Sequence, residues 1–347
     1  DVNFVLGVGI DRTSDGYRMA AQFPIAARLA GAAGPATYVT TVEGSTLKDA
    51  DRRLTEVLPG RAEWSHLQVV VVGEDVAREG LAQLTDFILR PQTARENTRL
   101  LVARGKASDI IKLSIPLEPL PPMGIDRTLK SLLQESMTMD STAIKFVDVM
   151  AEPGIDGVLP SIEAGPGGAP RLGPLAVFKG DRLVGWLSPE ETRGVSAIRA
   201  KTPRLSVLLP CQEDAPPQAD VEVHSHESRL EIRAEGGRLT ASIKVKARGQ
   251  LYEDACLRDV MQPPTRQELE RLGAEQVRRD IEAAVQRSKD LRADIFGFGR
   301  ELYRHQPQEW KRRKNRWDEE LARLPVTVSV ELTIDEGGVI NPPVTPR

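Results

Sequence analysis

The chain has 347 residues, which at about 150 residues per domain predicts two or three domains. Its 47 lysine and arginine residues nearly balance its 50 aspartate and glutamate residues, and this argues against a nucleic-acid-binding protein, which usually carries a basic excess. The only cysteines, Cys211 and Cys256, are too few for a four-cysteine zinc site or a disulfide-rich scaffold. The sequence leaves open whether they form one disulfide.

No stretch of the chain approaches the ~20 apolar residues that a membrane-spanning helix needs. The chain begins at Asp1-Val2-Asn3, without a methionine and already in a predicted strand. We therefore expect it to be the processed or trimmed part of a longer precursor.

The first 110 residues alternate between predicted strands and helices, the pattern of an α/β unit. Apolar and β-branched runs predict the strands, and apolar residues at helical spacing predict the helices. The predicted strands are 4–10, 17–23, 67–72 and 98–103, and the predicted helices are 47–58 and 74–90. We assign residues 1–110 to an N-terminal α/β domain.

Residues 111–212 form the predicted middle domain. Four prolines between residues 116 and 122 prevent a regular element there. The segment then contains predicted helices at about 125–137 and 141–150, a hairpin of strands 172–178 and 182–187, a helix that begins at Ser188-Pro189, and a strand at 205–209. The polar, proline-containing segment 213–218 marks the next boundary.

Residues 213–347 form the predicted C-terminal domain. The predicted elements are a long hairpin of strands 221–234 and 238–248, a helix of roughly 28 residues from Pro263, a helix ending near His305, a basic helix at 310–324 and an alternating strand at 326–334. The whole chain is predicted to be α+β, in three segments that each contain a mostly antiparallel or mixed sheet flanked by helices.

Few residues suggest catalytic or metal chemistry. His224 and His226 are two residues apart in a predicted strand, so they would share a face and make a weak candidate metal site. The glycines of Gly7-Val8-Gly9 lack the third glycine and the following helix of a phosphate-binding loop. Because no hydrolase or kinase motif is complete either, we expect no enzymatic activity and no cofactor.

The segment Asp294-Ile295-Phe296-Gly297-Phe298-Gly299 has two interpretations. The glycines can break a helix while Phe296 and Phe298 pack, or the segment can contact a partner protein. Downstream, Trp310 and Trp317 lie seven residues apart in a stretch with five cations in nine residues. They favour packing on a core, with contact to an anionic membrane surface as the alternative.

Four segments in order along the chain resemble one family, the C subunits of spore germinant receptors or Ger(x)C lipoproteins. They are residues 4–11 (FVLGVGID), 73–80 (GEDVAREG) with 84–87 (LTDF), 176–185 (AVFKGDRLVG), and 294–299 (DIFGFG) with Trp310 and Trp317. The resemblance covers nearly the whole chain. The sequence does not include the family's lipid-bearing cysteine, which would lie upstream of Asp1.

The resemblance implies a non-catalytic lipoprotein on the outer face of the spore inner membrane, made of α/β domains. It would assemble with an A subunit and a permease-like integral-membrane B subunit to start germination in response to nutrients. The candidates for contact with those partners are Phe296, Gly297, Phe298, Gly299, Trp310 and Trp317. The alternative is an extracytoplasmic lipoprotein that itself binds the nutrient in a concave pocket.

Overall fold

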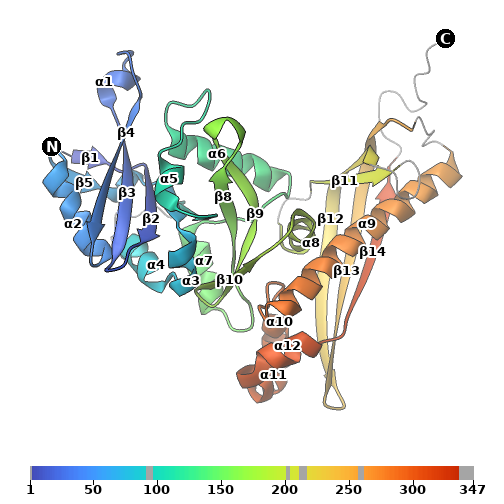
Figure 1. Cartoon of the computed structure of the whole chain (residues 1–347). Coiled ribbons are helices and arrows are strands. Elements are labelled where there is room, and N and C mark those ends of the chain that lie inside the picture. Colours follow the sequence, from blue (N-terminus) through green and yellow to red (C-terminus); the bar gives the residue numbers. More distant parts are fainter. Residues whose placement is uncertain (1, 91–96, 201–203, 211–216, 257–261, 336–347) are drawn as a thin grey trace, which may run out of the picture. The chain divides into compact units, whose positions relative to one another are not determined.

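The computed structural model describes residues 2–90, 97–200, 204–210, 217–256 and 262–335 (Figure 1). The chain divides into two compact units. Unit 1 comprises residues 1–131, 140–152 and 156–186, and unit 2 comprises residues 132–139, 153–155 and 187–347.

Unit 1 is built on an eight-stranded mixed sheet in the order β10-β9-β8-β7-β6-β2-β3-β4. Its strands are β2 (Gly7–Arg12), β3 (Tyr17–Pro24), β4 (Thr37–Gly44), β6 (Val69–Val72), β7 (Arg99–Ala103), β8 (Val158–Ala164), β9 (Pro170–Lys179) and β10 (Arg182–Trp186). The pairs β2–β6, β6–β7 and β7–β8 are parallel, and the outer pairs are antiparallel. A separate parallel pair joins β1 (Val2–Phe4) to β5 (Arg61–Glu63).

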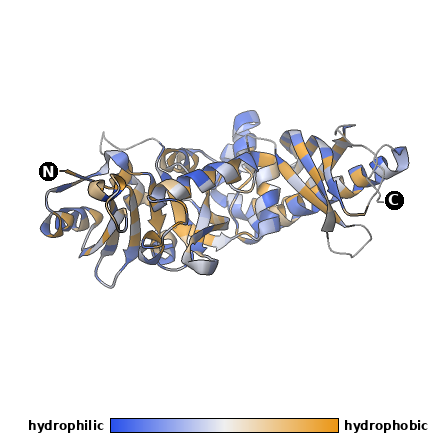
Figure 2. Cartoon of the chain, turned by 90° about the horizontal axis from the view of Figure 1, so that it is seen from above, coloured by the Kyte–Doolittle hydropathy of each residue, from blue (hydrophilic) through white to orange (hydrophobic). Residues whose placement is uncertain are grey.

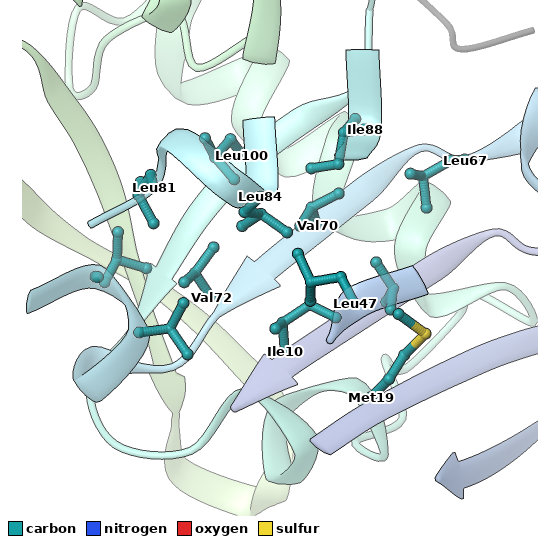
Figure 3. Packing of buried hydrophobic residues seen from close by; sticks show 14 of the residues in the cluster. Ile10, Met19, Leu47, Leu67, Val70, Val72, Leu81, Leu84, Ile88 and Leu100 are labelled. Carbon is teal, nitrogen blue, oxygen red and sulfur yellow. The ribbon is translucent and has the colours of Figure 1, made fainter. Parts of the chain in front are cut away.

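Helices cover both faces of this sheet, so its central strands are apolar throughout. In β6, Val70 and Val72 belong to one core cluster and Val69 and Val71 to the other. The helical segments of the first 199 residues are α1 (Ala26–Leu29), α2 (Leu47–Val57), η1 (Trp64–His66), α3 (Glu74–Glu79), α4 (Ala82–Leu89), α5 (Ala107–Ile111), α6 (Pro121–Gln134), α7 (Ala143–Ala151), η2 (Pro166–Gly168) and α8 (Pro189–Arg199). Figure 3 shows the cluster that includes Val70, Val72 and residues of α2 and α4.

Unit 2 contains a four-stranded sheet in the order β11-β12-β13-β14. The strands are β11 (Leu205–Pro210), β12 (Pro217–Glu235), β13 (Arg238–Asp254) and β14 (Val326–Ile334), and the last pairs in parallel with β13. Its helical segments after α8 are α9 (Pro263–Asp290), α10 (Phe298–His305), α11 (Pro307–Arg313), η3 (Lys314–Arg316) and α12 (Trp317–Arg323). These strands alternate hydrophobic and hydrophilic bands (Figure 2), because α9 packs on one face of the sheet.

Glycine allows the close contact between α8 and α9. A Cβ atom on Gly194 would lie 2.1 Å from the carbonyl oxygen of Asp280 in α9. The same crossing is held by an ion pair between Arg193 Nε and Asp280 Oδ2 at 2.9 Å. The helix itself begins with a capping box, in which Ser188 and Glu191 bond to each other's backbone N–H.

The α+β class is confirmed, with differences in how elements are divided. The predicted helix 74–90 is two helices, because Gly80 adopts a φ of +132° between them. The predicted helix 310–324 is likewise split into α11, η3 and α12. No helix within the described ranges combines the length and apolarity needed to cross a membrane.

The strands of the predicted middle domain are shared between the two sheets. Parallel pairing of β7 with β8 continues the unit 1 sheet beyond residue 110, whereas β11 joins the unit 2 sheet. The boundary predicted at residue 110 therefore falls inside α5. The boundary predicted at 212–213 lies outside the described residues.

Candidate functional site

A buried carboxylate organises the segment 294–299 in unit 2. Asp294 Oδ1 accepts hydrogen bonds from the backbone N–H groups of Gly297 (2.8 Å) and Phe298 (3.0 Å). Its Oδ2 accepts from the backbone N–H of Gly299 (2.7 Å) and from the indole N–H of Trp317 (3.0 Å). One side chain thus satisfies the first N–H groups of α10 and joins this helix to α12.

Burial and hydrogen bonding act in opposite directions on Asp294. Its side chain is fully buried, and burial raises its pKa to about 6. The hydrogen bonds from Gly299, Phe298, Trp317 and Gly297 lower the pKa and limit that rise. The carboxylate is therefore a structural centre whose protonation is coupled to the local fold.

Three glycines allow close packing around this segment. Gly297 has a φ of +82°, and Gly154 has a φ of +74° and its carbonyl oxygen accepts a hydrogen bond from the backbone N–H of Arg300 at 2.8 Å. A Cβ on Gly299 would lie 2.7 Å from Trp310 Cζ3 and 2.9 Å from both Gly154 Cα and Trp317 Cε2. We call residues 294–299 together with Gly154, Trp310 and Trp317 the Asp294 motif.

The aromatic residues predicted to contact a partner lie inside unit 2. Phe296 and Phe298 are at most 1% exposed, and Trp310 and Trp317 are 9% and 5% exposed. The two indole rings pack edge to face, with centroids 5.3 Å apart. Because these rings are buried, we assign the four side chains, with Gly297 and Gly299, a packing role in the Asp294 motif.

The basic stretch around the tryptophans is partly used within the unit. Arg313 is buried and contacts Glu309 (3.3 Å), Glu320 (3.1 Å) and the carbonyl of Gly237 (2.9 Å). Lys311 is exposed. Arg313 thereby connects the turn of the β12–β13 hairpin to α11 and α12, a packing role rather than a membrane-facing one.

His224 lies in a β-bulge of β12, and His226 follows that bulge. The pairing register with β13 shifts between Val223 and Ser225. His224 is exposed and its Nε2 lies 3.2 Å from Asp335 Oδ2, whereas His226 is half-buried and burial lowers its pKa. The shared face was inferred from strict alternation, which this bulge interrupts.

Other candidate ligands are few. Within the described ranges, no group of three or more histidine, cysteine, aspartate or glutamate side chains could hold a metal ion. Cys256 takes part in a disulfide, and Cys211 lies outside the described residues.

The two glycines of β2 and the aspartate that follows them form a structural joint in unit 1. A Cβ on Gly9 would lie 2.7 Å from the carbonyl oxygen of Ala107, so glycine allows α5 to lie directly on the strand. Asp11 is buried, and its carboxylate accepts the N–H groups of Ala107 (2.6 Å) and Ser108 (2.8 Å) at the start of α5. The segment 4–11 thus holds a helix rather than a phosphate.

Two segments about 100 residues apart in the sequence, at Gly80–Ala82 and at Asp181, meet in unit 1. The N–H of Leu81 bonds to the carbonyl of Asp181 (2.9 Å), and the N–H of Ala82 bonds to its carboxylate (3.1 Å). A Cβ on Gly80 would lie 2.5 Å from that carboxylate. The break between α3 and α4 is therefore hydrogen-bonded to the turn of the β9–β10 hairpin.

Comparisons with known proteins agree along the whole chain. Residues 1–164 match the family model "Spore germination protein N-terminal domain", and residues 174–338 match "Spore germination B3/ GerAC like, C-terminal". The chain is 28% identical to the putative spore germination protein YfkR and 25% identical to spore germination protein KC, both of Bacillus subtilis (strain 168). These alignments cover 98% and 99% of this chain and 91% of each relative.

The crystal structure of the GerBC protein has the same fold. It matches with a TM-score of 0.60 over 94% of this chain and 96% of that chain, at 19% sequence identity. Each of the four segments that resemble the family makes hydrogen bonds or packing contacts within one unit. The chain belongs to the GerAC-like family of spore germination proteins, the C-subunit family of germinant receptors.

Proposed function

We propose that this chain is the non-catalytic C subunit of a nutrient germinant receptor. It would be anchored by a lipid on an upstream cysteine, on the outer face of the spore inner membrane, and would assemble with an A subunit and a permease-like B subunit. The observation that carries the proposal is the match to both family domains, which extends through both units. The role in germination rests on that membership, and the partners and the membrane location are the proposed part.

The use of the carboxylates supports a binding role rather than a catalytic one. Asp11, Asp181 and Asp294 all accept backbone N–H groups of their own chain. Carboxylates used in this way stabilise folds, whereas a catalytic acid or base must reach a substrate. We therefore propose that the protein acts through the surfaces that these joints hold in place.

Co-purification from spore membranes tests the proposal. The full-length, lipidated protein with an affinity tag serves as bait, and the expected result is recovery of a permease-like integral-membrane protein and an A-type subunit. A variant lacking the lipid-bearing cysteine controls for membrane attachment and should recover less of both. Correctly lipidated bait that recovers neither protein would refute the assembly.

The structure also separates folding from assembly. Phe298→Ala removes a side chain that is 0% exposed, so loss of assembly in this variant should accompany loss of the cooperative thermal transition of unit 2. Lys311→Ala, on the exposed side of α11, should change neither. A Phe298→Ala variant that is stable but unassembled would instead assign this ring to the partner interface.

A further inference from the structure

Unit 1 contains a pocket that none of the structural joints uses. It has a volume of about 730 Å³ and opens between α2, the β5–η1 segment and α4. This volume is in the range of ~300–1,000 Å³ typical of small-molecule sites. A shallower hollow of about 460 Å³ shares Lys48 and Arg61 with it.

The interior of the pocket is apolar and reaches the core. Leu47, Leu67 and Ile88 line it and belong to the buried cluster shown in Figure 3. Trp64 and Phe87 form an edge-to-face pair on its wall, with centroids 5.6 Å apart. Because the indole N–H of Trp64 already donates to Asp51 at 2.9 Å, the ring is held in place before a ligand arrives.

The charges at the mouth of the pocket are unequally exposed. The cationic side chains of Lys48 and Arg61 are 80% and 72% exposed. Their carboxylate neighbours Asp51 and Glu63 are only 13% and 22% exposed. On the α4 side of the mouth, Arg90 is 75% exposed and its carboxylate partner Asp86 is 56% exposed. On the side of the mouth formed by α2 and β5, a ligand therefore meets the cations Lys48 and Arg61 first.

We propose that this pocket binds a small amphipathic monocarboxylate, with an apolar body among Leu47, Leu67 and Phe87 and its carboxylate at Lys48 and Arg61. The apolar interior provides the burial, and the exposed cations provide the selectivity for an anion. This site is independent of the assembly proposed above, because it lies wholly within unit 1.

Calorimetric titration of the purified chain tests the site with 3-phenylpropionate and octanoate. Their relative affinities distinguish an aromatic from an acyl body. The matched probes are 3-phenylpropanol, which keeps the body without the charge, and 3-phenylpropylamine, which reverses it. Saturable one-to-one binding of a carboxylate, about tenfold tighter than the alcohol and with the amine weakest, is expected from two exposed ion contacts.

Two variants place the binding in this pocket. Lys48→Gln with Arg61→Gln should weaken carboxylate binding about tenfold and leave alcohol binding unchanged, since only the charges are removed. Arg53→Gln, on the same helix but outside the pocket lining, should change neither affinity. Ala62→Trp should fill the pocket and abolish binding of all probes, with the thermal transition measured in parallel.

The proposal is overturned by any of three results. They are no saturable binding of either carboxylate at millimolar concentration, equal affinities for the acid, alcohol and amine, and unchanged carboxylate binding in the Lys48→Gln, Arg61→Gln double variant. The double variant changes only exposed side chains, so it decides the question even if Ala62→Trp does not fold.

Discussion

Gly299→Ala should destabilise unit 2, although alanine is the better helix former. Gly299 lies in α10 without a positive φ, so helix propensity alone predicts a gain of about 1 kcal/mol. The new Cβ would lie 2.7 Å from Trp310 Cζ3 and 2.9 Å from Trp317 Cε2 and Gly154 Cα. Such overpacking costs about 1–3 kcal/mol. Displacing Trp317 would also weaken its bond to Asp294, worth about 1.5–3 kcal/mol.

The net expectation is a loss of about 2–4 kcal/mol in the free energy of unfolding, or about 5–15 °C in Tm. Urea unfolding followed by far-ultraviolet circular dichroism and tryptophan fluorescence measures it, with Lys311→Ala as the surface control. Trp310→Leu in the Gly299→Ala background removes the nearest ring atom, so the two substitutions should be non-additive. A Gly299→Ala variant as stable as the unmodified chain would refute the packing argument.

Three further predictions concern Asp294, the contact between α8 and α9 at Gly194, and Asp11. Burial raises the pKa of Asp294 from 3.8 to about 6, so between these pH values the native state binds a proton more tightly than the unfolded chain. The free energy of unfolding should therefore fall by up to about 3 kcal/mol as pH rises from 4 to 6. Denaturant titrations across that range should show this slope, and Asp294→Asn should lack it; an identical slope in both would contradict the assignment. Gly194→Ala should cost at least about 1–3 kcal/mol because its Cβ meets the α9 backbone, and a neutral melting shift would argue against the crossing. Asp11→Ala should cost about 2–4 kcal/mol by leaving two buried N–H groups of α5 without an acceptor, against about 1 kcal/mol for Thr46→Ala at the N-terminus of α2.

Local sequence signals predicted most of the secondary structure. The β9–β10 hairpin, the capped start of α8 and the alternating strand β14 all depend on neighbours within a few residues. The break at Gly80 was missed because a glycine inside an apolar helical pattern does not reveal its φ. The bulge after Val223 was missed because the alternation of side chains between the two faces of a strand assumes uninterrupted pairing with the neighbouring strand.

Local sequence signals could not predict the contacts that define the Asp294 motif, because some of them join residues far apart in the sequence. Nothing near Gly154 in the sequence indicates that Gly299 would pack on it 145 residues later. For the aromatic residues, the sequence left packing and partner contact as two interpretations, and their side chains are buried. Exposed and buried uses of Phe and Trp have the same sequence pattern, and only the packing distinguishes them.

The three-residue segment 153–155 has a consequence for dissecting this protein. It is flanked on both sides by residues of unit 1, yet it belongs to unit 2, where Gly154 receives the N–H of Arg300 and lies against Gly299. A recombinant fragment starting at residue 174 or 187 would contain every strand of the unit 2 sheet but would lack residues 153–155. Its Trp rings would border a void, and the fragment should express as a loosely packed species. To restore this packing, residues 153–155 should be supplied through a circularly permuted linker rather than by extending the fragment at its C-terminus.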